Sequence, residues 1–99
     1  MLRIEQAQQR LLFNGTLDRN TVLDYWPFKQ LSSMSGQVVF DFKQLSSIDT
    51  AGLAWLLKQL ALARQGGLVV QLQHVPSQLC SLAEVTDVLA LLPINDNKE

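Results

Sequence analysis

The chain has 99 residues, of which 47% are hydrophobic and 17% are charged, and its formal net charge is −1. A chain of this size can bury one core as a single domain, and its high apolar fraction excludes an intrinsically disordered protein. The near-neutral charge argues against nonspecific nucleic-acid binding, which needs a basic face to neutralise phosphates.

An N-terminal hairpin is the first predicted element. Within residues 1–14, Leu2 and Ile4 alternate with polar neighbours and a short apolar run follows, which is typical of two short strands. The dipeptide Asn14-Gly15 is a turn signal, so we expect the second strand to end there.

A broken helix is predicted over residues 16–31, where apolar residues recur at roughly helical spacing. Asp18 or Asn20 can cap its start, because their side chains accept hydrogen bonds from the first free amides. Pro27 removes one helical hydrogen bond and clashes with the preceding turn, so we expect a break near Tyr25.

The rest of the chain alternates between strands and helices. The predicted segments are a loop (32–36), a buried strand (37–42), a polar loop (43–47), a helix ended by two glycines (50–65), a strand (68–72) and a helix (76–85). Residues 86–94 fit a last helical turn or a strand equally, and residues 95–99 are expected to form a solvated tail.

This order, β-β-α-β-α-β-α, predicts a small α/β domain spanning residues 1–94. Alternating strands and helices imply right-handed crossovers and a mixed, mostly parallel sheet with helices packed on it. The N-terminal hairpin is expected to add an antiparallel edge to that sheet.

The sequence offers little catalytic chemistry. His74 fits a strand-end histidine, Cys80 fits a half-buried thiol, and nothing in their spacing supports a nucleophile pair. We therefore expect no enzyme, no metal and no cofactor, with a Cys80–His74 enzyme as the weakest alternative. A lone cysteine and an N-terminus without an apolar signal favour a cytoplasmic protein, and no run approaches the ~20 apolar residues of a membrane span.

The segment around Asp49-Thr50 is the most informative one in the chain. It joins a strand to a helix at the carboxyl end of the sheet, where α/β domains usually present functional groups. Asp49 is placed to cap the helix, and a phosphate added to Thr50 would meet the positive end of the helix dipole. Gly52 would let another surface approach the backbone closely.

The helix over residues 50–65 predicts a core face and an uncovered face. The core stripe at i, i+3, i+4 and i+7 spacing comprises Leu53, Leu56, Leu57, Leu60 and Arg64. The opposite stripe comprises Ala51, Trp55, Lys58, Gln59 and Leu62, so we expect Trp55 and Leu62 to point away from the core and to contact a partner. The predicted contact residues are Asp49, Thr50, Ala51, Gly52, Trp55, Lys58 and Leu62.

Two runs of residues resemble a known family. Phe40-Asp41-Phe42, followed by Ile48-Asp49-Thr50-Ala51-Gly52-Leu53-Ala54 and a leucine-rich helix, resembles the STAS domain (sulfate transporter and anti-sigma factor antagonist). Its hallmark is a D-[ST]-x-G-L motif between the third strand and the second helix. The resemblance covers essentially the whole chain.

One branch of that family implies a transport subunit. A threonine followed by Gly-Leu-Ala, with Trp26 after Asn14-Gly15-Thr16-Leu17-Asp18, is similar to small cytoplasmic subunits of phospholipid-transporting ABC complexes of Gram-negative bacteria. By that resemblance the partner is the ATPase subunit, with Thr50 and the exposed helix face in the contact. The chain would then reach the inner membrane only through that complex, and would support outer-membrane lipid asymmetry.

A second branch implies a phosphorylation switch. In anti-sigma factor antagonists the motif residue is usually a serine, phosphorylated by a kinase that doubles as the anti-sigma factor, and Thr50 would be the acceptor here. The chain departs from the family at Ala51, where glycine or serine is more usual, and at Pro27. Without its partner, the uncovered Trp55 and Leu62 could pair two copies of the chain.

Overall fold

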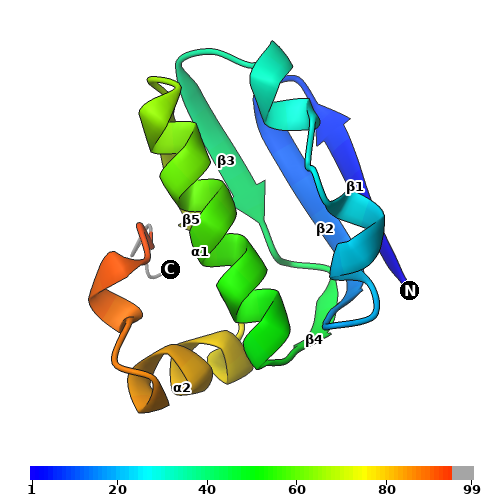
Figure 1. Cartoon of the computed structure of the whole chain (residues 1–99), viewed down its shortest axis with the longest axis vertical. Helices are drawn as coiled ribbons and strands as arrows, with labels where there is room; N and C mark the ends of the chain where they lie inside the picture. The colour runs from blue at the N-terminus through cyan, green and yellow to red at the C-terminus, as the bar shows by residue number, and fades with distance from the viewer. Residues whose placement is uncertain (95–99) are drawn as a thin grey trace.

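The computed structural model describes residues 1–94, so the tail predicted over residues 95–99 lies outside the described residues. Figure 1 shows the arrangement of the elements. In chain order they are β1 (Leu2–Ala7), β2 (Arg10–Leu17), the 3₁₀ turns η1 (Val22–Tyr25) and η2 (Gln30–Ser33), β3 (Gln37–Asp41), β4 (Leu45–Ile48), α1 (Thr50–Gln65), β5 (Val69–Gln73), α2 (Ser77–Val85) and the 3₁₀ turn η3 (Leu89–Leu91). The predicted α/β class is confirmed.

The five strands form one mixed sheet in the order β1-β2-β3-β5, with β4 paired to β2. β1 runs antiparallel to β2, and the other pairs are parallel. β2 is divided between two neighbours, since Arg10 to Leu12 pair with β3 whereas Gly15 to Leu17 pair with β4. The second half of β2 therefore holds the strand that leads directly into α1.

The turn predicted at Asn14-Gly15 is wrong. These residues lie inside β2, where Gly15 has a φ of 108° and the pairing with β4 shifts register before Thr16. The hairpin instead turns at Gln8 and Gln9, with Gln8 at a φ of 60°. Gly15 therefore forms part of a β-bulge and not a turn. Both structures often need a residue with positive φ, which glycine adopts easily.

Two further segments differ from the prediction. In place of the broken helix predicted over residues 16–31, β2 continues to Leu17 and η1 and η2 follow, with extended backbone at Trp26 between them. The expected break near Tyr25 is present. The buried side chains Phe28, Leu31 and Met34 recur every three residues, which suits tight turns. β4 occupies part of the predicted loop over residues 43–47, because its backbone pairs with β2 although Ser46 is polar and exposed.

The later elements agree with the prediction. α1 spans residues 50–65 as expected, and Gly66 and Gly67 follow it. The undecided segment over residues 86–94 contains η3, after which Ile94 forms an isolated parallel bridge to Leu72 of β5. No helix within residues 1–94 has the length and apolar character needed to cross a bilayer.

The core lies between the sheet and α1, which lies in front of the sheet in Figure 1 and runs roughly alongside β3. Alternate side chains of β2, β3 and β5 supply its centre, namely Leu11, Phe13, Val38, Phe40 and Leu72. Phe13 stacks against Phe40 and Phe42, with ring centroids 5.4 and 4.9 Å apart.

The opposite face of the sheet is mainly polar. Arg3, Glu5 and Val69 are exposed there, and Arg10 donates to Asp41 at 2.8 Å between Nη1 and Oδ2. Hydrophobic side chains in and polar side chains out is the pattern of a sheet packed on one face.

Candidate partner-binding site

Asp49 caps α1 as the sequence predicts. Its Oδ1 accepts a hydrogen bond from the Gly52 N–H at 2.8 Å, and the backbone N–H of Arg19 donates to its Oδ2 at 3.3 Å. The Asp49 N–H in turn donates to the carbonyl oxygen of Leu17 at 3.2 Å. The cap therefore fixes the start of α1 against the end of β2, and leaves Thr50 exposed at the first position of the helix.

Gly52 does allow a close approach, but the approaching surface belongs to this chain. Gly52 is buried, and a Cβ built on it would overlap the carbonyl oxygen of Leu17. The surface that approaches Gly52 closely is therefore β2 of the same chain. Thr50 is the exposed residue of the motif, and Asp49 and Ala51 on either side of it are half-buried.

The outward stripe predicted on α1 is partly wrong. Lys58 and Leu62 are exposed as predicted, but Trp55 is 4% exposed and Gln59 is fully buried. The helical-wheel prediction assumes that only the sheet covers α1. In the structure the segment between β2 and β3 covers a second side of α1, where Trp55 and Gln59 lie. Arg64, predicted on the core face, is instead exposed.

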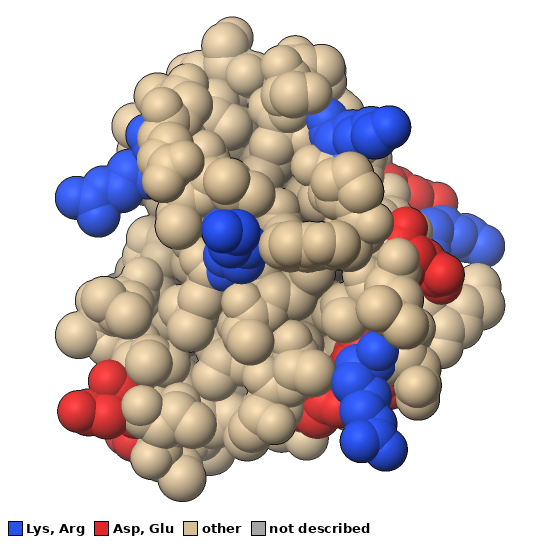
Figure 2. All heavy atoms as spheres, viewed as in Figure 1, with Lys and Arg blue, Asp and Glu red and all other residues tan. Residues whose placement is uncertain are grey.

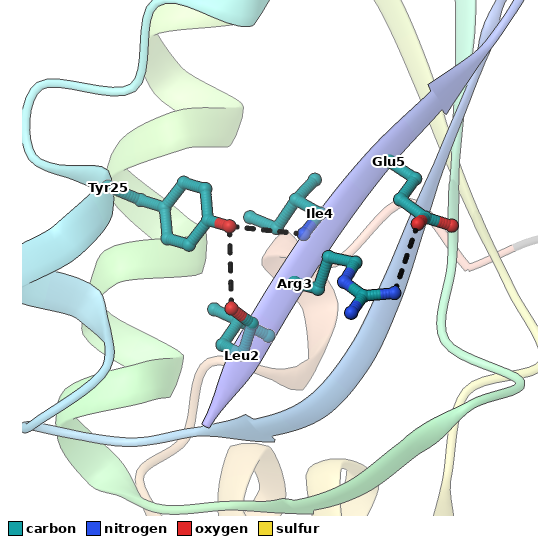
Figure 3. Close-up of polar contacts among 5 residues, drawn as sticks. All are labelled: Leu2, Arg3, Ile4, Glu5 and Tyr25. Carbon is teal, nitrogen blue, oxygen red and sulfur yellow. Dashed lines mark hydrogen bonds and ion pairs between the residues drawn. The ribbon is translucent and has the colours of Figure 1, made fainter.

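The segment that carries η1 is held from two directions. The indole Nε1–H of Trp55 donates to the Tyr25 carbonyl at 3.2 Å, and the Trp55 ring packs 5.2 Å from that of Phe28. Figure 3 shows the Tyr25 hydroxyl at β1, where it accepts from the Ile4 N–H at 3.2 Å and donates to the Leu2 carbonyl at 3.4 Å. Tyr25 thereby satisfies part of the free edge of the sheet and fixes the residues beside it.

The residues beside Tyr25 form an exposed apolar surface. Leu23 is 73% exposed and Trp26 is 54% exposed. With Ala54 and Lys58 they line a hollow of about 440 Å³ between η1 and α1. We call the full set the α1–η1 surface, and it comprises Leu23, Trp26, Thr50, Ala54, Lys58 and Leu62.

Figure 2 shows the face of the molecule on which α1 lies in Figure 1. Most of this face is uncharged, its Lys and Arg side chains stand apart from one another, and the acidic groups lie towards its rim. Sequence reasoning did not place Leu23, Trp26 or Ala54 at the contact. The available signal was the apolar character of Leu23 and Trp26 in a segment that Pro27 prevents from being one continuous helix.

A reciprocal pair of hydrogen bonds begins the η1 segment. The Asp18 Oδ1 accepts from the Thr21 N–H at 3.0 Å, and the Thr21 Oγ1 accepts from the Asp18 N–H at 2.9 Å. The bond from Thr21, together with a second from the Asn20 N–H, holds the pKa of the Asp18 carboxyl below its ordinary value of 3.8. Asp18, one of the two predicted caps, therefore orders the approach to Leu23 and Trp26.

This depressed pKa predicts an acid-sensitive η1 segment. Because the folded state favours the Asp18 carboxylate, this group stabilises the folded protein. The stabilisation is fully present above the ordinary pKa of 3.8 and is lost as the pH falls through the lower pKa of the folded state. We expect an NMR titration of the Asp18 carboxyl to give a pKa below 3.8. Asp18→Asn, which keeps the acceptor oxygen, should remove this part of the pH dependence of unfolding. An unshifted Asp18 titration would contradict the assignment.

The residues weighed for chemistry lie away from this surface in sequence. His74 is exposed in the turn after β5, and Cys80 is half-buried on α2. Within residues 1–94 there is no group of three or more His, Cys, Asp and Glu side chains that could hold a metal ion.

Comparison with known proteins gives consistent matches. The family described as "Mlab, STAS domain" matches residues 1–93. The chain is 32% identical over 85 residues to the intermembrane phospholipid transport system binding protein MlaB of Escherichia coli K12, covering 86% of this chain and 87% of that protein. MlaB of Shigella flexneri matches with the same identity and coverage.

Two solved structures share the fold. The anti-sigma factor antagonist SpoIIAA in its unphosphorylated form matches with a TM-score of 0.67 and 13% identity, over 99% of this chain and 90% of that chain. A putative anti-sigma factor antagonist from Thermotoga maritima matches with a TM-score of 0.73 and 15% identity, over 98% and 87% respectively.

Proposed function

The chain belongs to the MlaB family of STAS domains, and from this premise we propose that it is a non-enzymatic accessory subunit of a phospholipid-transport ABC complex. It binds the cytoplasmic ATPase of an Mla-type system, supports the assembly and activity of that complex, and so supports outer-membrane lipid asymmetry. It is cytoplasmic and reaches the inner membrane through this partner. No cofactor takes part.

The observation that carries this proposal is the α1–η1 surface in a chain related to MlaB. Trp26 offers a large apolar side chain that the chain itself covers only in part, and interfaces are typically anchored by such residues. A stable interface buries ~800 Å² on each partner, more than one helix stripe provides. The η1 residues add the area that α1 lacks, and Thr50 at the helix start marks one end of the contact.

Co-purification with a co-expressed ATPase subunit tests this proposal. We expect Trp26→Ala and Thr50→Glu each to lower recovery of the complex at least about tenfold, through loss of an anchor and through a buried unpaired charge. Val69→Ala, an exposed apolar residue on the opposite sheet face, is the matched control and should bind as wild type. Wild-type recovery of both surface variants would exclude this interface.

A phosphorylation switch at Thr50 is the second candidate function. Thr50 is exposed at the first residue of α1, where a phosphate would meet unpaired helix amides, and SpoIIAA shares the fold. If this chain is an anti-sigma factor antagonist, a cognate kinase with ATP should add the mass of one phosphate to wild type and none to Thr50→Val. An unchanged intact mass, or phosphate on another residue, would reject this function.

A further inference from the structure

The second half of α1 contains a buried amide that has no internal partner. Gln59 is fully buried, yet neither its Nε2 nor its Oε1 forms a hydrogen bond with any group of residues 1–94. Such groups are rare, because burial removes their hydrogen bonds to water without replacing them. Leucine at the same place would lack this penalty, so the amide costs stability in the isolated chain.

Gln59 lies beside a pocket that has no charged wall. The pocket measures about 320 Å³ and is formed between η2 and α1, with Phe28, Leu31, Met34 and Leu68 as its main apolar walls. Ser32 is the other polar side chain that lines it, and the Ser32 hydroxyl already donates to the Lys29 carbonyl at 2.7 Å. The volume lies at the small end of the range for ligand pockets.

We propose that this pocket binds a small, uncharged, largely apolar molecule that carries an amide-like edge and pairs it with Gln59. The proposal goes beyond the accessory role above and does not depend on it. Gln59 presents both a donor and an acceptor, so a group with the complementary pair, such as a carboxamide, satisfies both atoms at once. The apolar walls then cover the rest of the molecule.

The side chains that line the pocket favour an uncharged amide over a charged molecule or water. A carboxylate or ammonium group would lose its hydration with no opposite charge in the lining to compensate for it. Ordered water is a poor substitute, because buried waters typically make about three hydrogen bonds and the lining offers few free polar groups. The Gln59 amide lies beneath other side chains of the pocket wall. These side chains must move aside before the ligand can reach Gln59.

NMR titration of the full chain with hexanamide tests the proposal, with hexanoate as the charged analogue of the same length. We expect saturable shifts of the Gln59 side-chain amide signals with a dissociation constant on the order of 1 mM, and at least about tenfold weaker binding of hexanoate. Signals of Phe28 and Leu31 should move with those of Gln59, whereas those of Val69 on the opposite face should not.

Gln59→Leu provides the matched variant, because it keeps the volume and removes the amide. This variant should melt at a higher temperature than wild type when free, and should lose the preference for hexanamide over hexanoate. The proposal is overturned if hexanamide leaves the Gln59 signals unchanged, if hexanoate binds equally well, or if the variant keeps the preference. It is also overturned if bound water contacts the Gln59 amide and hexanamide does not displace it.

Discussion

Gly52→Ala is expected to destabilise the protein by about 2–3 kcal/mol, against the helix propensities of the two residues. Alanine is the better helix former by about 1 kcal/mol, so propensity alone predicts that this variant is more stable. The added Cβ would overlap the Leu17 carbonyl oxygen, which is backbone and also accepts the Asp49 N–H. Neither side can yield without separating α1 from β2, which places the cost near the upper end for overpacking.

Urea unfolding measures this effect, and the melting temperature should fall by roughly 10–20 °C for a domain of this size. Ala54→Ser also adds one heavy atom to the first half of α1, but at an exposed position. That control should change the free energy of unfolding by no more than about 0.5 kcal/mol. Equal stability of Gly52→Ala and wild type would contradict this prediction, because it would show that α1 and β2 can accommodate the added methyl group.

Trp55→Ala is expected to cost about 3–5 kcal/mol, the range for truncating a large buried aromatic side chain. The indole fills the space between α1 and the η1 segment, contacts the rings of Phe13 and Phe28, and donates its N–H to the Tyr25 carbonyl. The variant therefore creates a cavity and also leaves the part-buried Tyr25 carbonyl without this donor. Since the domain as a whole is stabilised by only about 5–15 kcal/mol, this is a large fraction of the total.

Trp26→Ala is the control, since it removes the same side chain from the surface. Trp26 is 54% exposed, so its free energy of unfolding should change by no more than about 1 kcal/mol. Urea unfolding of the two variants side by side distinguishes the tryptophan that holds the fold from the one available to a partner. If Trp26→Ala were the more destabilised variant, Trp26 and not Trp55 would be the tryptophan that holds the fold.

The elements that the sequence predicts well are those set by local chemistry. Asp49 and the glycines after residue 65 bound α1 without reference to the rest of the molecule, and the structure has the same limits. A β-turn and a β-bulge, by contrast, favour the same residue types, so the sequence does not distinguish them. Asn14-Gly15 can serve either, and only the pairing of β2 with β4 decides between them.

The candidate site shows the same limit in three dimensions. A helical wheel orders side chains around one axis but does not say how many neighbours the helix has. Lys58 and Leu62 remain exposed, whereas Trp55 and Gln59 are covered by the segment between β2 and β3. The sequence pattern predicts a broken helix for that segment, but it does not say which side of α1 the segment covers. The motif at Asp49-Thr50 could be located from sequence because capping is local.

The division of β2 between two neighbours bears on the thermodynamics of association. Leu17 holds the start of α1 through its carbonyl, and the Thr16 carbonyl accepts the Thr21 hydroxyl at 2.9 Å, which fixes the approach to η1. Both halves of the α1–η1 surface are thus attached to adjacent residues of one strand. A partner bound at this surface would meet a preorganised backbone, so little backbone entropy would be lost on binding. We therefore expect complex formation to leave the backbone of this surface within about 1 Å of its free position.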